Sequence, residues 1–75
     1  MPQKSVIFHF PSDLYDKPVI GRLMRDFHID VNILQAHIMP HEAGYMFAIV
    51  EGPDDETVRA LDYMRDLGVE LVIEF

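Results

Sequence analysis

Four segments of the chain have the pattern of strands: three alternate between two faces with the period of two that is typical of half-buried strands, and one is apolar on both faces. These segments are residues 4–10, 29–39, 45–51 and 69–75. In the first segment, the residues on one face are Val6, Phe8 and Phe10, and those on the other are Ser5, Ile7 and His9. The third segment is apolar on both faces, so its pattern alone does not decide which face points inward. The alternation predicts four strands.

Two further segments repeat apolar residues at the spacing of an amphipathic helix. The first predicted stripe consists of Val19, Leu23 and Phe27, joined by Ile20 and Met24. The second consists of Val58, Leu61, Met64 and Leu67, joined by Ala60. Each helix stands between two predicted strands.

The residues around these segments are those expected at helix ends and turns. Asp16 or Lys17 lies near the first helix cap, with Pro18 in the first turn. Acidic residues 54–56 open the second helix, where they complement its dipole, and Gly68 suits its C-terminal end. Residues 41–44 form a hairpin loop in which Gly44 supplies any positive φ.

The second strand carries a carboxamide where the pattern predicts apolar residues. Strict alternation puts Asn32 on the same face as Leu34, Ala36 and Ile38, with Gln35 and His37 on the other face. An unpaired buried carboxamide costs about 1–3 kcal/mol, so the side chain of Asn32 must find partners.

The order of elements is βαββαβ, which predicts an α+β fold of the ferredoxin-like type. Its four antiparallel strands form one sheet, and both helices cover the same face. Right-handed crossovers place the first and third strands in the middle and the other two at the edges. The 75 residues make one domain, covering residues 1–75.

The face of the sheet that the helices leave open is predicted to be apolar. Ile7 lies there, and the third strand contributes apolar residues in either orientation, as Phe47 and Ile49 or as Met46, Ala48 and Val50. Val72 interrupts the glutamates of the last strand. Such a patch favours self-association as a symmetric homodimer through the open face. The alternative is that these are the scattered apolar groups of any protein surface.

Composition narrows the functional classes. Thirteen Asp and Glu against six Lys and Arg give a net charge of −7, which disfavours nucleic acids and anionic membrane surfaces. The apolar runs are far shorter than the ~20 residues that span a bilayer. The absence of cysteine excludes disulfides and thiolate-held metals. With no signal-peptide pattern at Met1, we expect a cytoplasmic protein without membrane insertion.

No motif indicates catalysis, and we expect no enzyme activity, metal or cofactor. His37, His41 and Glu42 lie near one hairpin, and His9 joins His37 if their strands are neighbours, but that spacing does not bring imidazoles together as a helix would. Solvated or half-buried histidines are the alternative. No pair of carboxylates is set on an apolar face as acid–base catalysis requires.

One stretch resembles a known family. Residues 18–38 contain Asn32-Ile33-Leu34 at the spacing of the motif that gives the NIL domain its name. The resemblance continues through Gly44, the hydrophobic third strand and residues 68–70. Its best-known members are the C-terminal regulatory domains of bacterial methionine-import ATPases, in which two copies pair and bind methionine to shut down transport. The family is similar in fold to the ACT amino-acid sensors.

The resemblance implies a small regulatory domain that binds an amino acid, with methionine as the first candidate, at or near a homodimer interface. The implied ligand-binding residues are Asn32, Ile33, Leu34, Gly44 and Met46. The N–H groups at the start of the first helix suit a ligand carboxylate. Alternatively, Asn32 binds local backbone groups, and the chain is an interaction or dimerisation module without a small-molecule ligand. A transporter or another protein is the expected partner.

Overall fold

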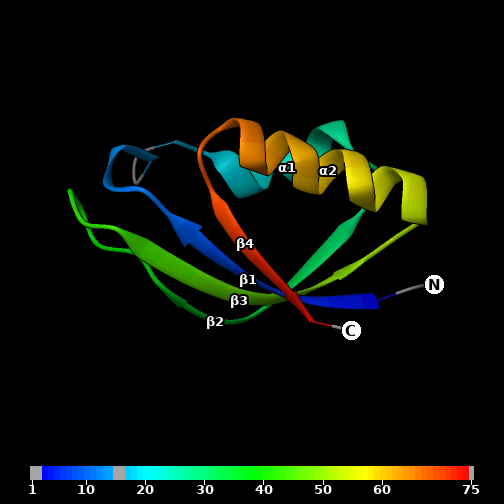
Figure 1. The fold of residues 1–75 in the computed structure, drawn as a ribbon, viewed down its shortest axis with the longest axis horizontal. Coiled ribbons are helices and arrows are strands. Elements are labelled where there is room, and N and C mark those ends of the chain that lie inside the picture. The colour runs from blue at the N-terminus through cyan, green and yellow to red at the C-terminus, as the bar shows by residue number, and fades with distance from the viewer. Residues whose placement is uncertain (1–2, 15–16, 75) are drawn as a thin grey trace.

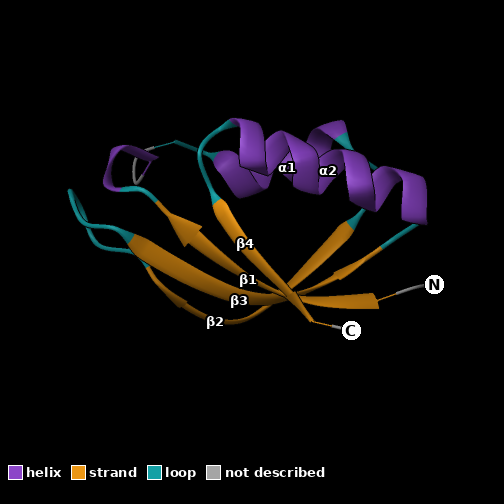
Figure 2. Cartoon of the chain, in the orientation of Figure 1, coloured by secondary structure: helices purple, strands orange, loops and turns teal. Residues whose placement is uncertain are grey.

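The computed structural model describes residues 3–14 and 17–74. Its elements are β1 (Gln3–Phe10), a short 3-10 helix (Ser12–Leu14), α1 (Val19–Asp26), β2 (Asp30–His37), β3 (Gly44–Glu51), α2 (Asp54–Asp66) and β4 (Glu70–Glu74). The strands form one antiparallel sheet in the order β2-β3-β1-β4, with both helices on one face (Figures 1 and 2). The ferredoxin-like prediction is confirmed.

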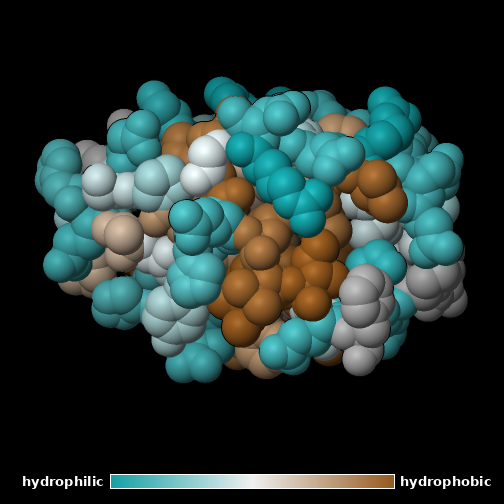
Figure 3. Space-filling view, viewed as in Figure 1, coloured by the Kyte–Doolittle hydropathy of each residue, from teal (hydrophilic) through white to brown (hydrophobic). Residues whose placement is uncertain are grey.

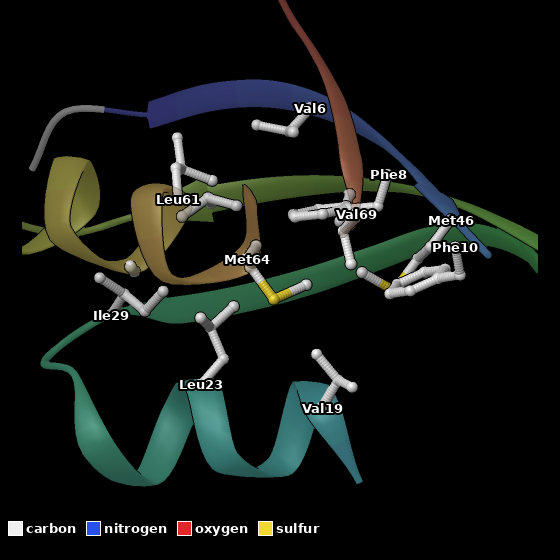
Figure 4. Packing of buried hydrophobic residues seen from close by; sticks show 13 residues of the cluster. Val6, Phe8, Phe10, Val19, Leu23, Ile29, Met46, Leu61, Met64 and Val69 are labelled. Atoms are coloured by element: carbon white, nitrogen blue, oxygen red, sulfur yellow. The ribbon is translucent and has the colours of Figure 1, made fainter. Parts of the chain in front are cut away.

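The core lies between the helices and the central strands β1 and β3. Val6 and Phe8 of β1 are fully buried, as is Leu23 of α1, and Met64 of α2 packs between the helix and the sheet (Figure 4). The alternate residues of β3 that join this core are Met46, Ala48 and Val50. The alternation predicted for β1 is confirmed, and the structure selects the orientation of β3 that its sequence left open.

The predicted apolar stripes of the helices are partly wrong. In α2 the buried residues are Thr57, Ala60, Leu61 and Met64. Val58, predicted to be buried, is 53% exposed, because a helix that buries positions 57, 60, 61 and 64 turns position 58 toward solvent. In α1, Met24 is likewise exposed.

The predicted face of Asn32 is wrong because β2 contains a bulge. The pairing of β2 with β3 shifts between Ile33 and Gln35, so one extra residue, Leu34, interrupts the alternation. Asn32, Gln35 and His37 therefore lie on the open face, opposite the residues of β3 that point away from the core. Asn32 is exposed, so its carboxamide is solvated rather than buried.

The predicted role of Gly44 is also wrong, since the positive φ in this hairpin belongs to His41, at 64°. Gly44 is needed for space instead. A Cβ at Gly44 would stand 2.7 Å from the backbone oxygen of His37. Gly68, at φ 98°, confirms the predicted end of α2.

Candidate ligand pocket

A small pocket opens between the end of β1, the start of α1 and the β2–β3 hairpin. Its volume is about 180 Å³. The residues that line it are Phe10, Pro11, Leu14, Lys17, Pro18, Val19, Ile20, Gly21, Ile38, Glu42 and Gly44. Apolar groups dominate this wall, and the two charged residues have opposite signs.

The local sequence explains why the pocket stays open. Pro11 ends β1 and Pro18 occupies the N-cap position of α1, so the connection between them cannot continue either element. The N–H of Leu14 donates to the oxygen of Pro11 at 3.1 Å, which closes a tight turn. Gly21 adds no side chain to the wall, and a Cβ there would meet nothing within 4 Å.

The start of α1 has the polarity that suits an anion. Helix N-termini carry partial positive charge and N–H groups without intrahelical partners. Among the described residues, no side chain hydrogen-bonds to this end of α1. Lys17 adds a positive charge on the same side of the pocket, and Glu42 of the hairpin adds a negative one.

The five predicted ligand-binding residues do not gather in this pocket. Gly44 lines it. Met46 is 1% exposed and belongs to the core. Ile33 and Leu34 are each 50% exposed on β2. Asn32 is six residues from Ile38 in the sequence, so about 20 Å of extended chain separates it from the pocket wall.

The open face of the sheet forms a separate surface. Its residues stand in cross-strand rows: Glu70, His9, Tyr45 and His37; then Val72, Ile7, Phe47 and Gln35; then Glu74, Ser5, Ile49 and Asn32. The middle row is largely apolar, and the outer rows are largely polar. The rings of His37 and Tyr45 stack with their centroids 6.1 Å apart.

The histidines are not brought together as a metal site would require. β3 lies between β1 and β2, so Tyr45 separates His9 from His37. Within residues 3–14 and 17–74, no group of three or more His, Asp or Glu side chains is placed to hold a metal ion. In the same ranges, none of the helices has the length and apolar character needed to cross a membrane.

The sequence model of the NIL domain family matches residues 4–72, which is nearly the whole chain. The chain belongs to the NIL domain family. It is 37% identical over 67 residues to the methionine import ATP-binding protein MetN of Halalkalibacterium halodurans, covering 85% of this chain and 20% of that protein. The MetN of Geobacillus kaustophilus is 41% identical over 61 residues, covering 75% of this chain and 18% of that protein.

The NIL chain thus spans about a fifth of the length of these MetN relatives. A relative of similar size is an uncharacterized protein of Synechococcus elongatus, 30% identical over 63 residues, which cover 81% of this chain and 78% of that one. The C-terminal domain of an ABC transporter ATP-binding protein from Enterococcus faecalis has the same fold, with a TM-score of 0.81. Its sequence identity is 23%, over 93% of this chain and 81% of that one.

The pocket contains charged residues that were not among the predicted ligand-binding residues. Lys17 and Glu42 are far apart in the sequence and line one pocket only through the fold. The available signal was the pair of prolines, Pro11 directly after the first strand and Pro18 directly before the first helix. The sequence also predicted that the start of the first helix suits a ligand carboxylate, and the start of α1 lines this pocket.

Proposed function

We propose that this NIL domain is a non-enzymatic regulatory domain that binds an amino acid with an apolar side chain, near a homodimer interface. Methionine is the first candidate, because the relatives named above are methionine import proteins. A cytoplasmic transporter subunit or another protein partner reads the bound state. The observation that supports this proposal is the pocket at the start of α1.

The size and wall chemistry of the pocket suit such a ligand. At about 180 Å³ it is smaller than the 300 Å³ or more typical of drug-sized ligands. Phe10, Leu14 and Ile38 offer apolar contacts to a side chain of a few carbon or sulfur atoms.

The charges at the pocket suit the other end of an amino acid. The ligand's carboxylate goes to Lys17 and the start of α1, and its ammonium group goes to Glu42. Two opposite charges beside one apolar wall select a zwitterion over a simple fatty acid or amine. Gly44 belongs to this wall, and Met46 supports it from the core. Asn32, Ile33 and Leu34 belong to the nearby edge strand and contribute through the dimer.

A thermal-shift screen against the twenty amino acids tests the proposal. A ligand present at a hundred times its dissociation constant stabilises the folded state by about 2.7 kcal/mol, a large shift in melting temperature for a small domain. We expect methionine to give the largest shift, and glycine and aspartate to give none. A screen in which no amino acid raises the melting temperature would contradict the proposal.

The variant Gly21→Leu provides a matched control. Gly21 lines the pocket, a Cβ there would meet nothing within 4 Å, and Leu is a better helix former than Gly. We therefore expect this variant to fold with at least the stability of the parent and to lose the methionine shift. A methionine shift that survives Gly21→Leu would place the ligand elsewhere on the domain.

The second candidate function is an interaction module without a small-molecule ligand. Its specific support is the number of exposed large apolar residues along β2 and its flanks. A null ligand screen together with a stable dimer favours this module over the sensor.

A further inference from the structure

Apolar side chains from three neighbouring strands stand together on the open face of the sheet. Both α-helices lie on the other side, and no described helix covers this one (Figure 1). The patch consists of Val72 of β4, Ile7 of β1, and Tyr45, Phe47 and Ile49 of β3. Val72 is 46% exposed, and the others are half-buried. A contiguous apolar patch that nothing in the described chain covers indicates a contact surface.

Carboxylates stand at the margins of this patch. Glu70 and Glu74 flank Val72 on β4. Glu51 and Asp30 stand opposite each other at the far end of β3 and β2. The patch therefore has negative charge on more than one side.

The cations of the chain lie elsewhere. Among the described residues, which include all six Lys and Arg, none belongs to the rows of the open face. Five belong to the helices or to the connection before α1. The sixth, Lys4 of β1, pairs with Val50, which lies on the helix side of the sheet. The open face thus carries negative charge that no Lys or Arg of the same face balances.

A shallow hollow at one end of the open face has the same polarity. Its volume is about 350 Å³, and its lining includes His9, Gly68 and Glu70. Glu70 is the one carboxylate among the lining residues, and none of them is Lys or Arg. This hollow suits the ammonium or guanidinium group of a partner's side chain.

We propose that the open face binds a basic amphipathic helix of a partner protein. The apolar side of that helix lies on Val72, Ile7 and Phe47. Its Lys or Arg side chains reach the surrounding carboxylates, and one of them occupies the hollow beside Glu70. This inference goes beyond the proposed function, because it requires neither a bound amino acid nor a second copy of the chain.

The dimensions of the patch fit one helix. From Val72 across Ile7 to Phe47, three adjacent strands span about 10 Å, which is the diameter of a single helix. Along β3, Tyr45 to Ile49 covers about 14 Å, the length of about nine helical residues. The helices α1 and α2 already cover the other face of the same sheet, so a partner helix would make the sheet the middle of three layers.

Charge favours this occupant over the others that an apolar face can take. A second copy, itself at a net charge of −7, would press its own carboxylates against those of the first. Nucleic-acid backbones and anionic lipid headgroups are repelled for the same reason. A basic helix instead finds opposite charge around the apolar contact, which favours its approach and fixes its orientation.

Isothermal titration calorimetry with a synthetic peptide, without added amino acids, tests the proposal. The probe is an amidated peptide of about 14 residues, with leucine along one side of the helix and lysine elsewhere. We expect it to bind the parent chain, and added salt to weaken the binding. A peptide of the same composition, with its leucines spread around the helix, should bind at least about tenfold more weakly. Equal affinity for the two peptides would overturn the proposal.

A matched pair of charge reversals tests the location. Glu70→Lys/Glu74→Lys should weaken binding of the amphipathic peptide at least about tenfold. The new lysines still repel each other across a self-paired β4 and so keep this edge protected. Asp62→Lys/Asp66→Lys changes the net charge equally on the exposed side of α2 and should change the affinity less than about twofold, because distant exposed charges are screened. Equal losses in both variants would show attraction to net charge alone and overturn the proposal.

A second pair tests the apolar contact. Val72→Thr keeps the branched shape that suits a strand and adds a hydroxyl group, and it should weaken peptide binding at least about threefold. Val58→Thr makes the same change at an equally exposed position of α2 and should leave the affinity unchanged.

NMR amide shifts on the parent chain locate the bound peptide. We expect the largest changes at Ile7, Phe47 and Val72. Changes centred on the acidic residues 54–56, or a parent dimer that Val72→Thr weakens, would overturn the proposal. A null amino-acid screen alongside peptide binding at the open face would count against the ligand pocket and leave this inference standing.

Discussion

The two edges of the sheet differ in length, charge and exposure. β2 has eight residues, seven of them exposed, and no charge between its ends. β4 has five residues, and Glu70 and Glu74 flank Val72 on its open face. Below α2, along β4, Figure 3 shows an apolar patch with hydrophilic residues around it. Leu71 and Ile73 of β4 are half-buried against the core.

The difference shows how one small sheet can keep one edge for pairing and protect the other. If β4 paired with itself about Val72, Glu70 would stand opposite Glu74 of the second copy at both ends of a short strand. On β2, Asp30 stands opposite Glu51 of β3 in the same chain. Glu51 accepts a hydrogen bond from the Gln3 amide at 2.8 Å. The β4 edge thus carries apolar side chains, but its glutamates oppose pairing with a second copy of the same strand.

The largest expected effect comes from the hairpin that holds β2 in place. Gly44→Ala puts a Cβ 2.7 Å from the backbone oxygen of His37, the last residue of β2. Overpacking of this kind costs about 1–3 kcal/mol, and here backbone must move rather than a flexible side chain. Urea denaturation should show a loss of about 2 kcal/mol in the free energy of unfolding. Unchanged stability would mean that the β2–β3 hairpin shifts to accept the extra carbon at no cost.

Removal of the charges on β4 should make the two edges alike. In Glu70→Thr/Glu74→Thr, β4 keeps its apolar residues and loses the repulsion that opposes self-pairing. Since β2 is unchanged and stays open to pairing, we expect both edges to pair, seen as a mass that rises with concentration in light scattering. The exchange Glu70→Asp/Glu74→Asp keeps the charge and serves as the control. Particles of unchanged mass would show that charge is not what protects β4.

The smallest effect is expected at Gly21 of α1, which lines the pocket and belongs to neither edge strand. Gly21→Ala adds a methyl group that meets nothing within 4 Å in the interior of α1. Helix propensity favours Ala by about 1 kcal/mol. Urea denaturation should show a gain of up to that size with no change in dimer affinity. A loss of stability would indicate that the start of α1 depends on the glycine backbone.

The sequence predicted the elements because most of them have a recognisable period. Val6, Phe8 and Phe10 recur at every second position, and each helix repeats apolar residues at helical spacing, so the strand order and most of the core could be predicted. The bulge at Leu34 was missed because no glycine or proline marks it, and it moved Asn32 to the other face. In α2 the prediction was right for Ala60, Leu61 and Met64 and wrong only at its start, where the apolar Val58 was chosen over the neighbouring Thr57, which is the buried residue.

The pocket was beyond prediction for a different reason. Its walls come from the β1–α1 connection and from the β2–β3 hairpin, which meet only in the folded chain. Nothing in the sequence pairs Lys17 with Glu42, because they come from two different connections that line one pocket in the fold. Family resemblance indicated a ligand, while the pocket itself follows from tertiary packing.

Amide hydrogen exchange, followed by NMR on the parent chain, tests the difference between the two edges most directly. The outward-pointing N–H groups of β2 find partners only if a second strand pairs there, whereas those of β4 remain open to water. We predict that the outward amides of β2 are protected at high protein concentration and lose protection on dilution, while those of β4 exchange rapidly throughout. Fast exchange along the outer side of β2 at every concentration, or concentration-dependent protection on β4 instead, would contradict the account.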